Sequence, residues 1–347
     1  MHRGVWRGQP VAVLVLRGGA TGAQEALLAE AGVLERPGAH PHLTRLHGLT
    51  RDPAGGLGLV TEYLPQGSLH ALLAEHGGRT ADAALLAVGL QVCLALGRPA
   101  VQTPPLVHRD VAARNVLVLR LNALDAGPVH VQLSDQGMAR QGQSGYYTSG
   151  AGGATPDAQP VRWVPPEALL QGRWGEKSDV WAYGVLLWEL WSQGELPYYA
   201  VKGDEGLIER VAKKGLRLAR PEGCPPAVYA VMQRCWELLP ANWPTVQQLQ
   251  SLLMQTLGVL RAAAAQDGIA AGVAGLAVAW AACRSTWRTP SSTPSRRRRR
   301  RRRRGRRSRR TRPRLWPFRS RRASSPRCRR SSSAAPASAL WRRFGAA

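Results

Sequence analysis

The eight residues HRDVAARN, at positions 108–115, decide the fold of this 347-residue chain, and three shorter stretches follow them in order. They read SDQG at 134–137, VRWVPPE at 161–167 and SDVWAYG at 178–184. Any one of them has a plain structural alternative, because an aspartate beside arginine and asparagine also caps helices while its neighbours lie in solvent. Four stretches in one order instead indicate a polar site that is assembled from separate parts of the chain.

Together the four stretches resemble the protein kinase family, and the resemblance covers residues 1–257. The ending AARN and the VRW before PPE are similar to the tyrosine kinase branch, whereas serine/threonine kinases usually have lysine where this chain has Ala112. The resemblance implies an α+β fold of two lobes: a small β-rich N-lobe, truncated at its start, over residues 1–65, and a larger α-helical C-lobe over 66–257. It also implies ATP and Mg²⁺ as cofactors, and phosphoryl transfer from ATP to a tyrosine of a protein substrate.

Hydrophobic periodicity is consistent with this division. The alternating residues Val11, Val13 and Val15 predict a buried strand, one of two within residues 2–17. The apolar stretch at 178–191 is too short to cross a bilayer, so it is expected as a central buried helix. Further strands are predicted at 43–49, 57–63, 116–119 and 129–133, and further helices at 21–35, 206–214, 226–238 and 245–257.

The resemblance assigns catalytic and metal-binding roles within these stretches. Asp110 would orient the substrate hydroxyl and accept its proton, and Arg114 would lie beside the acceptor tyrosine. Asn115 would bind one Mg²⁺, and Asp135 would bind Mg²⁺ that bridges the ATP phosphates.

The stretch LVTEYL at 59–64 looks like the hinge that binds adenine in kinases. Adenine would form hydrogen bonds with the backbone of Glu62 and Leu64, and Thr61 would be the gatekeeper residue. The alternative reading of these residues is an ordinary strand followed by a turn.

Several positions depart from the family pattern. Leu14 stands where the resemblance predicts the lysine that contacts the ATP phosphates. Its expected partner, Glu30 on the helix before His40-Pro41-His42, therefore has no cation to pair with. The alternative reading of Glu30 is a solvated carboxylate on a helix face. The chain starts at MHRGVWRG, and a G-x-G-x-x-G loop is therefore expected to be missing. Gln136 replaces an aromatic ring that would stack with Leu34, Leu46 and His108.

A further departure concerns stability. The resemblance implies that Glu167 pairs with an arginine close to the C-terminal helix, but Asn242-Trp243-Pro244 stands there. Glu167 is therefore expected to have lost its guanidinium partner.

Two functions from different classes follow. The first is a tyrosine kinase whose phosphoryl transfer is impaired by the absent lysine and loop. The second is a pseudokinase, a binding or scaffold module with the kinase shape and negligible turnover; its partner, like the substrate of the first, would be a protein with a tyrosine.

The segment at 141–155 is rich in glycine, serine and threonine and is interpreted as a mobile activation loop. It carries Tyr146 and Tyr147. Phosphate on either of them is expected to pair with Arg109 and to order the loop. The alternative is an unmodified flexible loop.

Charge divides the chain sharply. The formal net charge is +26, but residues 284–347 hold 25 arginines and no acidic residue, which leaves +1 for residues 1–283. This excludes a basic nucleic-acid-binding fold along the whole chain and allows a basic arm. Residues 258–347, rich in Ala and Gly and then in Arg, Ser and Pro, are expected to form a disordered tail.

The nine consecutive arginines at 296–304 are expected to contact polyanions, whether RNA, DNA or anionic lipid, without sequence preference, and they suit a nuclear-localisation patch. The alternative is a solvated low-complexity extension without a selected role.

Cysteine usage indicates the compartment. The five cysteines are widely spaced and include no C-x-x-C pair, which argues against a disulfide framework and a zinc site and fits a reducing environment. The apolar runs at 11–16 and 268–283 are too short for a signal peptide and a membrane span respectively. A cytoplasmic location is expected, with the nucleus as a further one because of the arginines.

Overall fold

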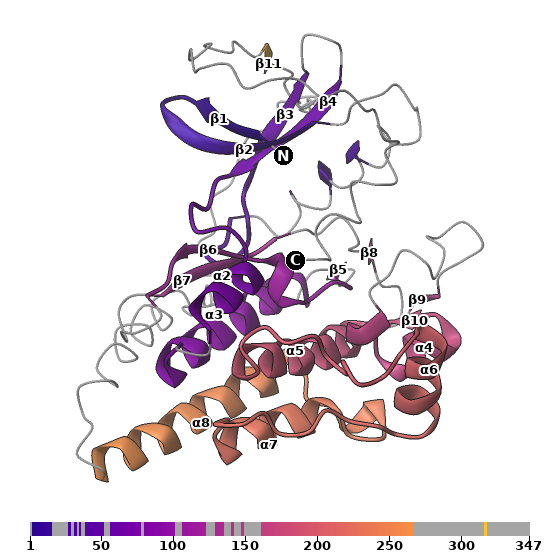
Figure 1. Cartoon of the computed structure of the whole chain (residues 1–347). Helices are drawn as coiled ribbons and strands as arrows, with labels where there is room; N and C mark the ends of the chain where they lie inside the picture. Colours follow the sequence, from indigo (N-terminus) through magenta and orange to yellow (C-terminus); the bar gives the residue numbers. More distant parts are fainter. Residues whose placement is uncertain are drawn as a thin grey trace, which may run out of the picture.

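The computed structural model has a small β-sheet lobe above a larger helical lobe (Figure 1). It describes residues 2–15, 27–28, 31–32, 35, 39–51, 56–77, 80–100, 106–122, 129–134, 140–141, 147–148, 161–266 and 316–317. The two-lobed α+β fold expected from the sequence is confirmed.

The N-lobe is an antiparallel sheet in the order β1-β2-β4-β3. Its strands are β1 (His2–Trp6), β2 (Gln9–Val15), β3 (Leu46–Arg51) and β4 (Leu57–Glu62). Arg7 and Gly8 join β1 to β2 with φ angles of 51° and 80°, the left-handed pair that a two-residue hairpin needs. Three consecutive residues are buried in β2 (Val11 to Val13) and in β4 (Leu57 to Leu59), so burial in these strands does not follow the alternation that the valines predicted.

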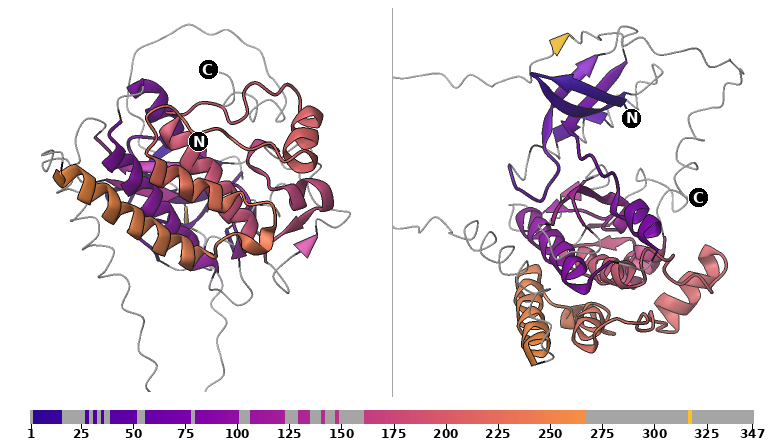
Figure 2. Two further views of the ribbon diagram at one scale, coloured as in Figure 1. Left: turned by 90° about the horizontal axis from the view of Figure 1, so that it is seen from below. Right: turned by 60° about the vertical axis from the view of Figure 1, so that its left-hand side comes forward.

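Four long helices form the frame of the C-lobe, and Figure 2 shows them stacked below the sheet lobe. They are α3 (Asp82–Ala100), α5 (Glu176–Trp191), α7 (Pro226–Cys235) and α8 (Val246–Gln266). Helix α5 is central, because every residue from Ser178 to Trp191 is buried. Shorter helical elements surround it: α2 (Leu69–His76), α4 (Pro166–Gln171), α6 (Asp204–Ile208) and the π-helical turn η5 (Glu209–Lys213).

Three short strand pairs lie in the upper part of the C-lobe, towards the N-lobe. Strand β6 (Val116–Arg120) pairs with β7 (His130–Leu133), β5 (Leu106–Val107) with β8 (Arg140–Gln141), and β9 (Tyr147–Thr148) with β10 (Arg173–Trp174). The lobes meet where Thr44 N donates to Leu133 O at 3.0 Å and Leu133 N donates to His42 O at 2.9 Å. These pairs bring the ends of the quoted sequence stretches to one place.

The structure differs from the sequence-based expectations at three places. Helix α8 continues to Gln266, nine residues past the predicted end of this helix at 257, because residues 262–265 are four alanines, the strongest helix formers. Within the segment predicted as a mobile loop, Tyr147 and Thr148 form β9. Within the predicted disordered tail, Trp316 and Pro317 form β11 and pair with β3, because the outer edge of β3 offers backbone groups to an extended segment.

Candidate active site

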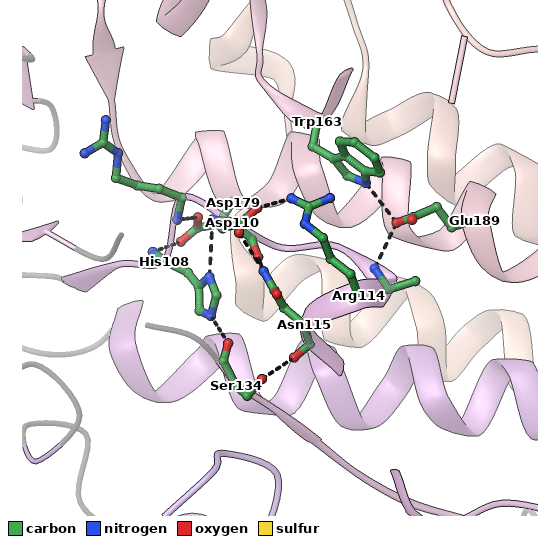
Figure 3. A network of polar contacts seen from close by, with 10 residues as sticks. His108, Asp110, Arg114, Asn115, Ser134, Trp163, Asp179 and Glu189 are labelled. Atoms are coloured by element: carbon green, nitrogen blue, oxygen red, sulfur yellow. Dashed lines mark hydrogen bonds and ion pairs between the residues drawn. The ribbon is translucent and has the colours of Figure 1, made fainter. Parts of the chain in front are cut away.

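The catalytic stretch folds so that two of its side chains converge on the carboxylate of Asp110 (Figure 3). The amide nitrogen of Asn115 donates to the Asp110 carboxylate at 2.7 Å and to the Asp110 backbone carbonyl at 2.8 Å. The Arg114 guanidinium forms a hydrogen-bonded ion pair with the same carboxylate. Asp110 is only 6% exposed, and two neighbours from its own loop hold its carboxylate in one orientation.

Asp179 on α5 holds the backbone at the start of this loop. Its two carboxylate oxygens accept hydrogen bonds from His108 N and Arg109 N, each at 2.8 Å. Arg109 has φ of 71°, a strained conformation for a non-glycine residue, and these two bonds stabilise it. Burial raises the pKa of Asp179 to about 7, and the two backbone donors offset only part of that rise.

His108 connects the loop to the strand pair above it. Its Nδ1 accepts from Asp110 N at 3.3 Å, and its Nε2 lies 3.1 Å from Ser134 O. Since Nδ1 accepts a hydrogen bond, Nε2 must carry the proton and donate it to Ser134. Burial lowers the pKa of His108 to about 4, so this imidazole is neutral at physiological pH.

Glu189, also on α5, joins the catalytic loop to the segment around VRW. Its Oε2 accepts from Ala113 N at 3.0 Å and from Trp163 Nε1 at 2.8 Å. The Arg114 guanidinium lies 4.3 Å from the centre of the Trp163 ring, within cation–π range. Burial raises the pKa of Glu189 to about 7. Arg114 is therefore fixed on one side by Asp110 and on the other by an indole that Glu189 orients.

Arg109, expected to meet a phosphate, lies beside an aromatic ring. Its guanidinium is 4.2 Å from the centre of the Trp174 ring, and Trp174 pairs through its backbone with Tyr147 in the β9–β10 pair. The structure thus brings Arg109 close to the backbone of one of the two tyrosines that the sequence singled out. Tyr146 lies outside the described residues.

The predicted hinge lies between the lobes, at the end of β4. Thr61 and Glu62 are its last residues, and Leu64, which is 5% exposed, follows in the segment that enters the C-lobe. Gln132 on β7 donates to the Glu62 carboxylate at 3.0 Å, so this side chain spans from the connecting segment to the strand pair beside the catalytic loop.

Leu14 packs into the small apolar cluster of the N-lobe. The cluster consists of Leu27, Ala31, Leu57 and Leu59, with Leu14, Leu46 and Leu49 against it. Leu27 and Ala31 are helical and have the spacing predicted within 21–35. Leu14, which stands where the family pattern has lysine, therefore makes an apolar contact between the sheet and these helical residues. Glu30, Asp135 and Gln136 lie outside the described residues.

The Glu167 carboxylate is buried, and neither of its oxygens has a hydrogen-bonding partner among the residues that the structure describes. Burial raises its pKa to about 7, and Arg173 and the Ser178 hydroxyl, which lie close by, offset part of the rise. Trp243 packs against Trp181 with 5.2 Å between ring centres and an angle of 43° between the ring planes, in the region where the resemblance implied an arginine.

The described residues allow a limited test of the implied cofactors. No three of their His, Cys, Asp and Glu side chains are grouped so as to hold a metal ion. Asn115 points its amide nitrogen at Asp110, which turns its amide oxygen, a ligand that suits Mg²⁺, away from that pair. Asn115 therefore fits one metal ligand position, whereas Leu14 offers no charge to a phosphate.

Sequence reasoning missed Glu189 and gave Asp179 no role. Both stand in the stretch from 178 to 191, which was interpreted as uniformly apolar, and a carboxylate in an otherwise buried helix is the signal that would have identified them. Carboxylates are almost never fully buried unless they are paired. A partner outside the helix should therefore have been sought for each.

Comparison with known proteins shows which family the chain resembles. The family model "Protein tyrosine and serine/threonine kinase" matches residues 1–253. The chain is 34% identical over 261 residues to the tyrosine-protein kinase Btk and 37% identical over 257 residues to the tyrosine-protein kinase Abl, both of Drosophila melanogaster. It is 34% identical over 269 residues to the megakaryocyte-associated tyrosine-protein kinase of Mus musculus.

These matches cover 74%, 73% and 76% of this chain but only 31%, 15% and 48% of the three relatives, so the chain spans less than half of their length. Among the described residues, no helix is long and apolar enough to cross a membrane. The matched region contains both lobes and every residue of the polar site described above. The chain belongs to the protein tyrosine kinase family.

Proposed function

We propose that this domain catalyses phosphoryl transfer from Mg²⁺-ATP to tyrosine in a protein, at a rate reduced by the leucine at position 14. One observation carries the proposal: Asn115 and Arg114 hold the Asp110 carboxylate in a fixed orientation inside a network anchored on α5. A carboxylate held in this way meets the geometric need of a group that orients a hydroxyl and accepts its proton.

In this proposal Asp110 receives the tyrosine hydroxyl, and Arg114, stacked on Trp163, lies beside the aromatic acceptor. Asn115 and Asp135 hold Mg²⁺, which supplies charge neutralisation for the phosphoryl group when bound. The backbone of Glu62 and Leu64 receives the adenine, with Thr61 at the back of the site. The rate is low because removal of one group that stabilises transition-state charge typically costs about 10²–10³ in rate.

A second candidate is a binding or scaffold module without turnover. It is favoured by the packing of Leu14 into the apolar cluster with Leu27 and Leu57, since an apolar side chain there stabilises the small lobe without any nucleotide. The protein partner would then bind to the surface of the domain without being phosphorylated.

One experiment separates the two candidates. Mg²⁺-ATP is titrated against the full chain with thermal unfolding as readout, and phosphorylation of a poly-Glu-Tyr substrate is then measured. Under the enzymatic proposal the chain shows weak Mg²⁺-dependent stabilisation and slow phosphorylation that Asp110→Asn abolishes. Phosphorylation that is absent, or that persists in Asp110→Asn, overturns it.

The variant Leu14→Lys tests the placement of the small lobe. It should raise ATP affinity or rate if Glu30 faces position 14, whereas the control Leu14→Met, which keeps an apolar side chain of similar volume, should change neither. If Leu14→Lys folds and changes neither quantity, the assignment of Leu14 and Glu30 is wrong.

The arginine-rich segment gives a separate proposal. Residues 284–347 contain 25 arginines and no acidic residue, and this positive charge favours contact with polyanions such as RNA, DNA or anionic lipid. The same charge favours a nuclear location in addition to a cytoplasmic one. Deleting residues 284–347 should abolish RNA binding that falls steeply with salt, and should change the cellular location. If the truncated chain binds RNA and localises as the full chain does, the segment has no such role.

A further inference from the structure

A pocket of about 750 Å³ lies in the C-lobe between the start of α3 and the end of α5, the two helices labelled in Figure 1. Its walls are the end of α5, the loop after it at 192–201, and the loop at 216–223 that leads to α7. The described residues that line it include none of the candidate active site or of the hinge. Its volume falls within the range of about 300–1,000 Å³ that is typical of small-molecule sites.

We propose that this pocket binds an aromatic cation, that is, a small molecule whose planar ring carries an amidinium or ammonium group. The proposal goes beyond the proposed function, and it does not depend on whether the domain is catalytically active.

Aromatic side chains line the pocket on two sides. Trp188 and Trp191 on α5 are buried beneath it, and Tyr198 and Tyr199 come from the loop after the helix. Tyr199 is exposed to solvent, so part of this aromatic surface is open to an incoming molecule. Aromatic side chains attract planar rings and cations, and a ligand that combines the two uses both interactions.

The acidic side chains of the pocket favour a positive charge. Asp82, at the start of α3, accepts a hydrogen bond from Trp191 Nε1 through Oδ1 at 2.9 Å. Its second oxygen accepts none from the residues that the structure describes, so it is available to a ligand. Glu195 and Glu222 also line the pocket, and both are exposed.

The N–H donors of the lining are largely engaged within the protein. Trp188 Nε1 donates to Ala219 O at 2.9 Å. The Arg217 guanidinium donates to carbonyl oxygens, among them that of Trp236 at 2.8 Å. The other arginine of the lining, Arg220, is exposed. The pocket therefore offers a ligand more acceptors than donors, which suits a molecule that donates hydrogen bonds.

Strained backbone marks the loop after α5. Gln193 and Tyr198 have φ angles of 57° and 54°, which are costly for residues other than glycine, and such conformations cluster at ligand-binding and active sites. The Arg162 guanidinium holds this loop, because it donates to the carbonyl oxygens of Pro197 and Tyr198 at 2.8 Å each and to that of Val201 at 3.1 Å. The wall is therefore fixed in the absence of a ligand.

Unpaired polar atoms are concentrated in the same wall. Thr80 Oγ1, Gln193 Oε1 and the Tyr198 hydroxyl are buried and have no hydrogen-bonding partner among the described residues. Thr80 and Tyr198 are each only 6% exposed. Buried polar groups in native structures nearly always have a partner, so three unpaired atoms at one pocket indicate a polar ligand rather than a purely apolar one.

The test uses three probes that share one ring and differ in charge: benzamidine, benzamide and benzoate. Each is titrated against the full chain, and its affinity is measured by saturation-transfer NMR. We expect benzamidine to bind about fivefold more tightly than benzamide and about tenfold or more than benzoate, because only benzamidine forms a charge-assisted hydrogen bond with Asp82. Absence of binding, or equal affinity for the three probes, would overturn the proposal.

Asp82→Asn removes the charge and keeps an acceptor oxygen for Trp191. It should lower the affinity for benzamidine to that for benzamide. The matched control is Asp204→Asn, since Asp204 is also an exposed aspartate in the first turn of a helix but does not line the pocket. An affinity for benzamidine that is the same in Asp82→Asn and Asp204→Asn would show that the cation does not bind at Asp82.

Ala200→Trp locates the site independently of charge. Ala200 is an exposed residue of the lining, so an indole there should occupy the pocket without disturbing the core, and binding of all three probes should be lost. Ala230→Trp, at an exposed residue of α7 outside the pocket, should bind the probes as the parent does. Thermal unfolding confirms that each variant is folded. Benzamidine binding that survives in a folded Ala200→Trp would place the probe elsewhere and overturn the proposal.

Discussion

Glu189 and Trp163 are joined by a hydrogen bond of 2.8 Å from the indole nitrogen to Oε2, and the same oxygen accepts Ala113 N at 3.0 Å. One buried carboxylate therefore holds both the catalytic loop and the segment that follows the activation loop. The Arg114 guanidinium rests on the indole that this carboxylate orients. The position of Arg114 thus depends on a residue 75 positions away in the sequence.

Replacing Glu189 should destabilise the domain through the donors that it leaves unpaired. In Glu189→Ala, the buried Ala113 N–H and the partly buried Trp163 indole N–H lose their acceptor, and we expect the free energy of unfolding to fall by about 2–4 kcal/mol. Glu189→Gln keeps an acceptor oxygen and should cost less than half as much. Urea denaturation of the full chain measures both, with the exposed Glu195→Ala as control. Equal losses for Glu189→Ala and Glu195→Ala would contradict the structure.

Stability should fall as pH rises through neutrality, because burial raises the pKa of Glu167 to about 7. The folded chain then binds this proton more tightly than the unfolded chain. The stabilisation is complete below the unfolded pKa of about 4.5 and is lost as pH rises through 7. From this residue we expect a loss of up to about 3 kcal/mol in the free energy of unfolding between pH 5 and pH 8.

Asp179 and Glu189 also have pKa values raised to about 7 by burial, and they contribute to the same slope. The comparison that isolates Glu167 is therefore between the parent and Glu167→Gln, which should lose less stability over this pH range. Glu195→Gln, at an exposed carboxylate, should keep the parent slope. Parallel pH profiles for the parent and Glu167→Gln would show that this carboxyl does not titrate differently in the two states.

A methyl group at position 184 should disrupt the contact between α5 and α7. A Cβ on Gly184 would lie 2.6 Å from Trp236 Nε1 and 2.7 Å from Cys235 Cβ, both too close for any real contact. Overpacking of a rigid interior typically costs about 1–3 kcal/mol, so Gly184→Ala should lower the melting temperature by several degrees.

Gly206→Ala is the matched control, because a Cβ there would meet its nearest neighbour, Val201, at 3.8 Å, an ordinary contact. Gly206 lies in α6, and alanine is favoured over glycine in helices, so this variant should be neutral or slightly more stable. Thermal unfolding of both variants decides the matter. A Gly184→Ala variant as stable as the parent would mean that α5 and α7 pack less closely than described.

The sequence predicted the parts of the site that depend on local order in the chain. The stretch from 108 to 115 is continuous, the family resemblance assigned roles to Asp110, Arg114 and Asn115 within it, and the fold brings these three side chains together. Glu189 could not be placed in the same way, since its partners Ala113 and Trp163 come from two other elements and only the packing of α5 brings them together.

The elements were predicted well where periodicity was strong, and less well at their ends. The strands of the N-lobe and the central helix appear close to where the pattern put them. The end of α8 was misplaced, because the alanines at 262–265 are helix formers without an amphipathic pattern. Strand β11 could not be predicted, because its pairing with β3 depends on an edge that forms only in the folded N-lobe.

Tyrosine phosphorylation is the last prediction, and it rests on the arrangement of Arg109, Trp174 and Tyr147. The backbone of Tyr147 pairs with that of Trp174, whose ring lies 4.2 Å from the Arg109 guanidinium. A phosphate on Tyr146 or Tyr147 would add close to two negative charges, and we expect it to pair with the Arg109 guanidinium through charge-assisted hydrogen bonds. We expect mass spectrometry of the chain co-expressed with an active tyrosine kinase to find phosphate on at least one of these two residues, and the modified chain to unfold at a higher temperature.

Arg109→Ala should remove that thermal gain without preventing modification, whereas Arg220→Ala, at an arginine outside the site, should leave it unchanged. Unmodified Tyr146 and Tyr147 under these conditions would rule out this regulatory role, and a thermal gain that survives Arg109→Ala would rule out Arg109 as the residue that receives the phosphate.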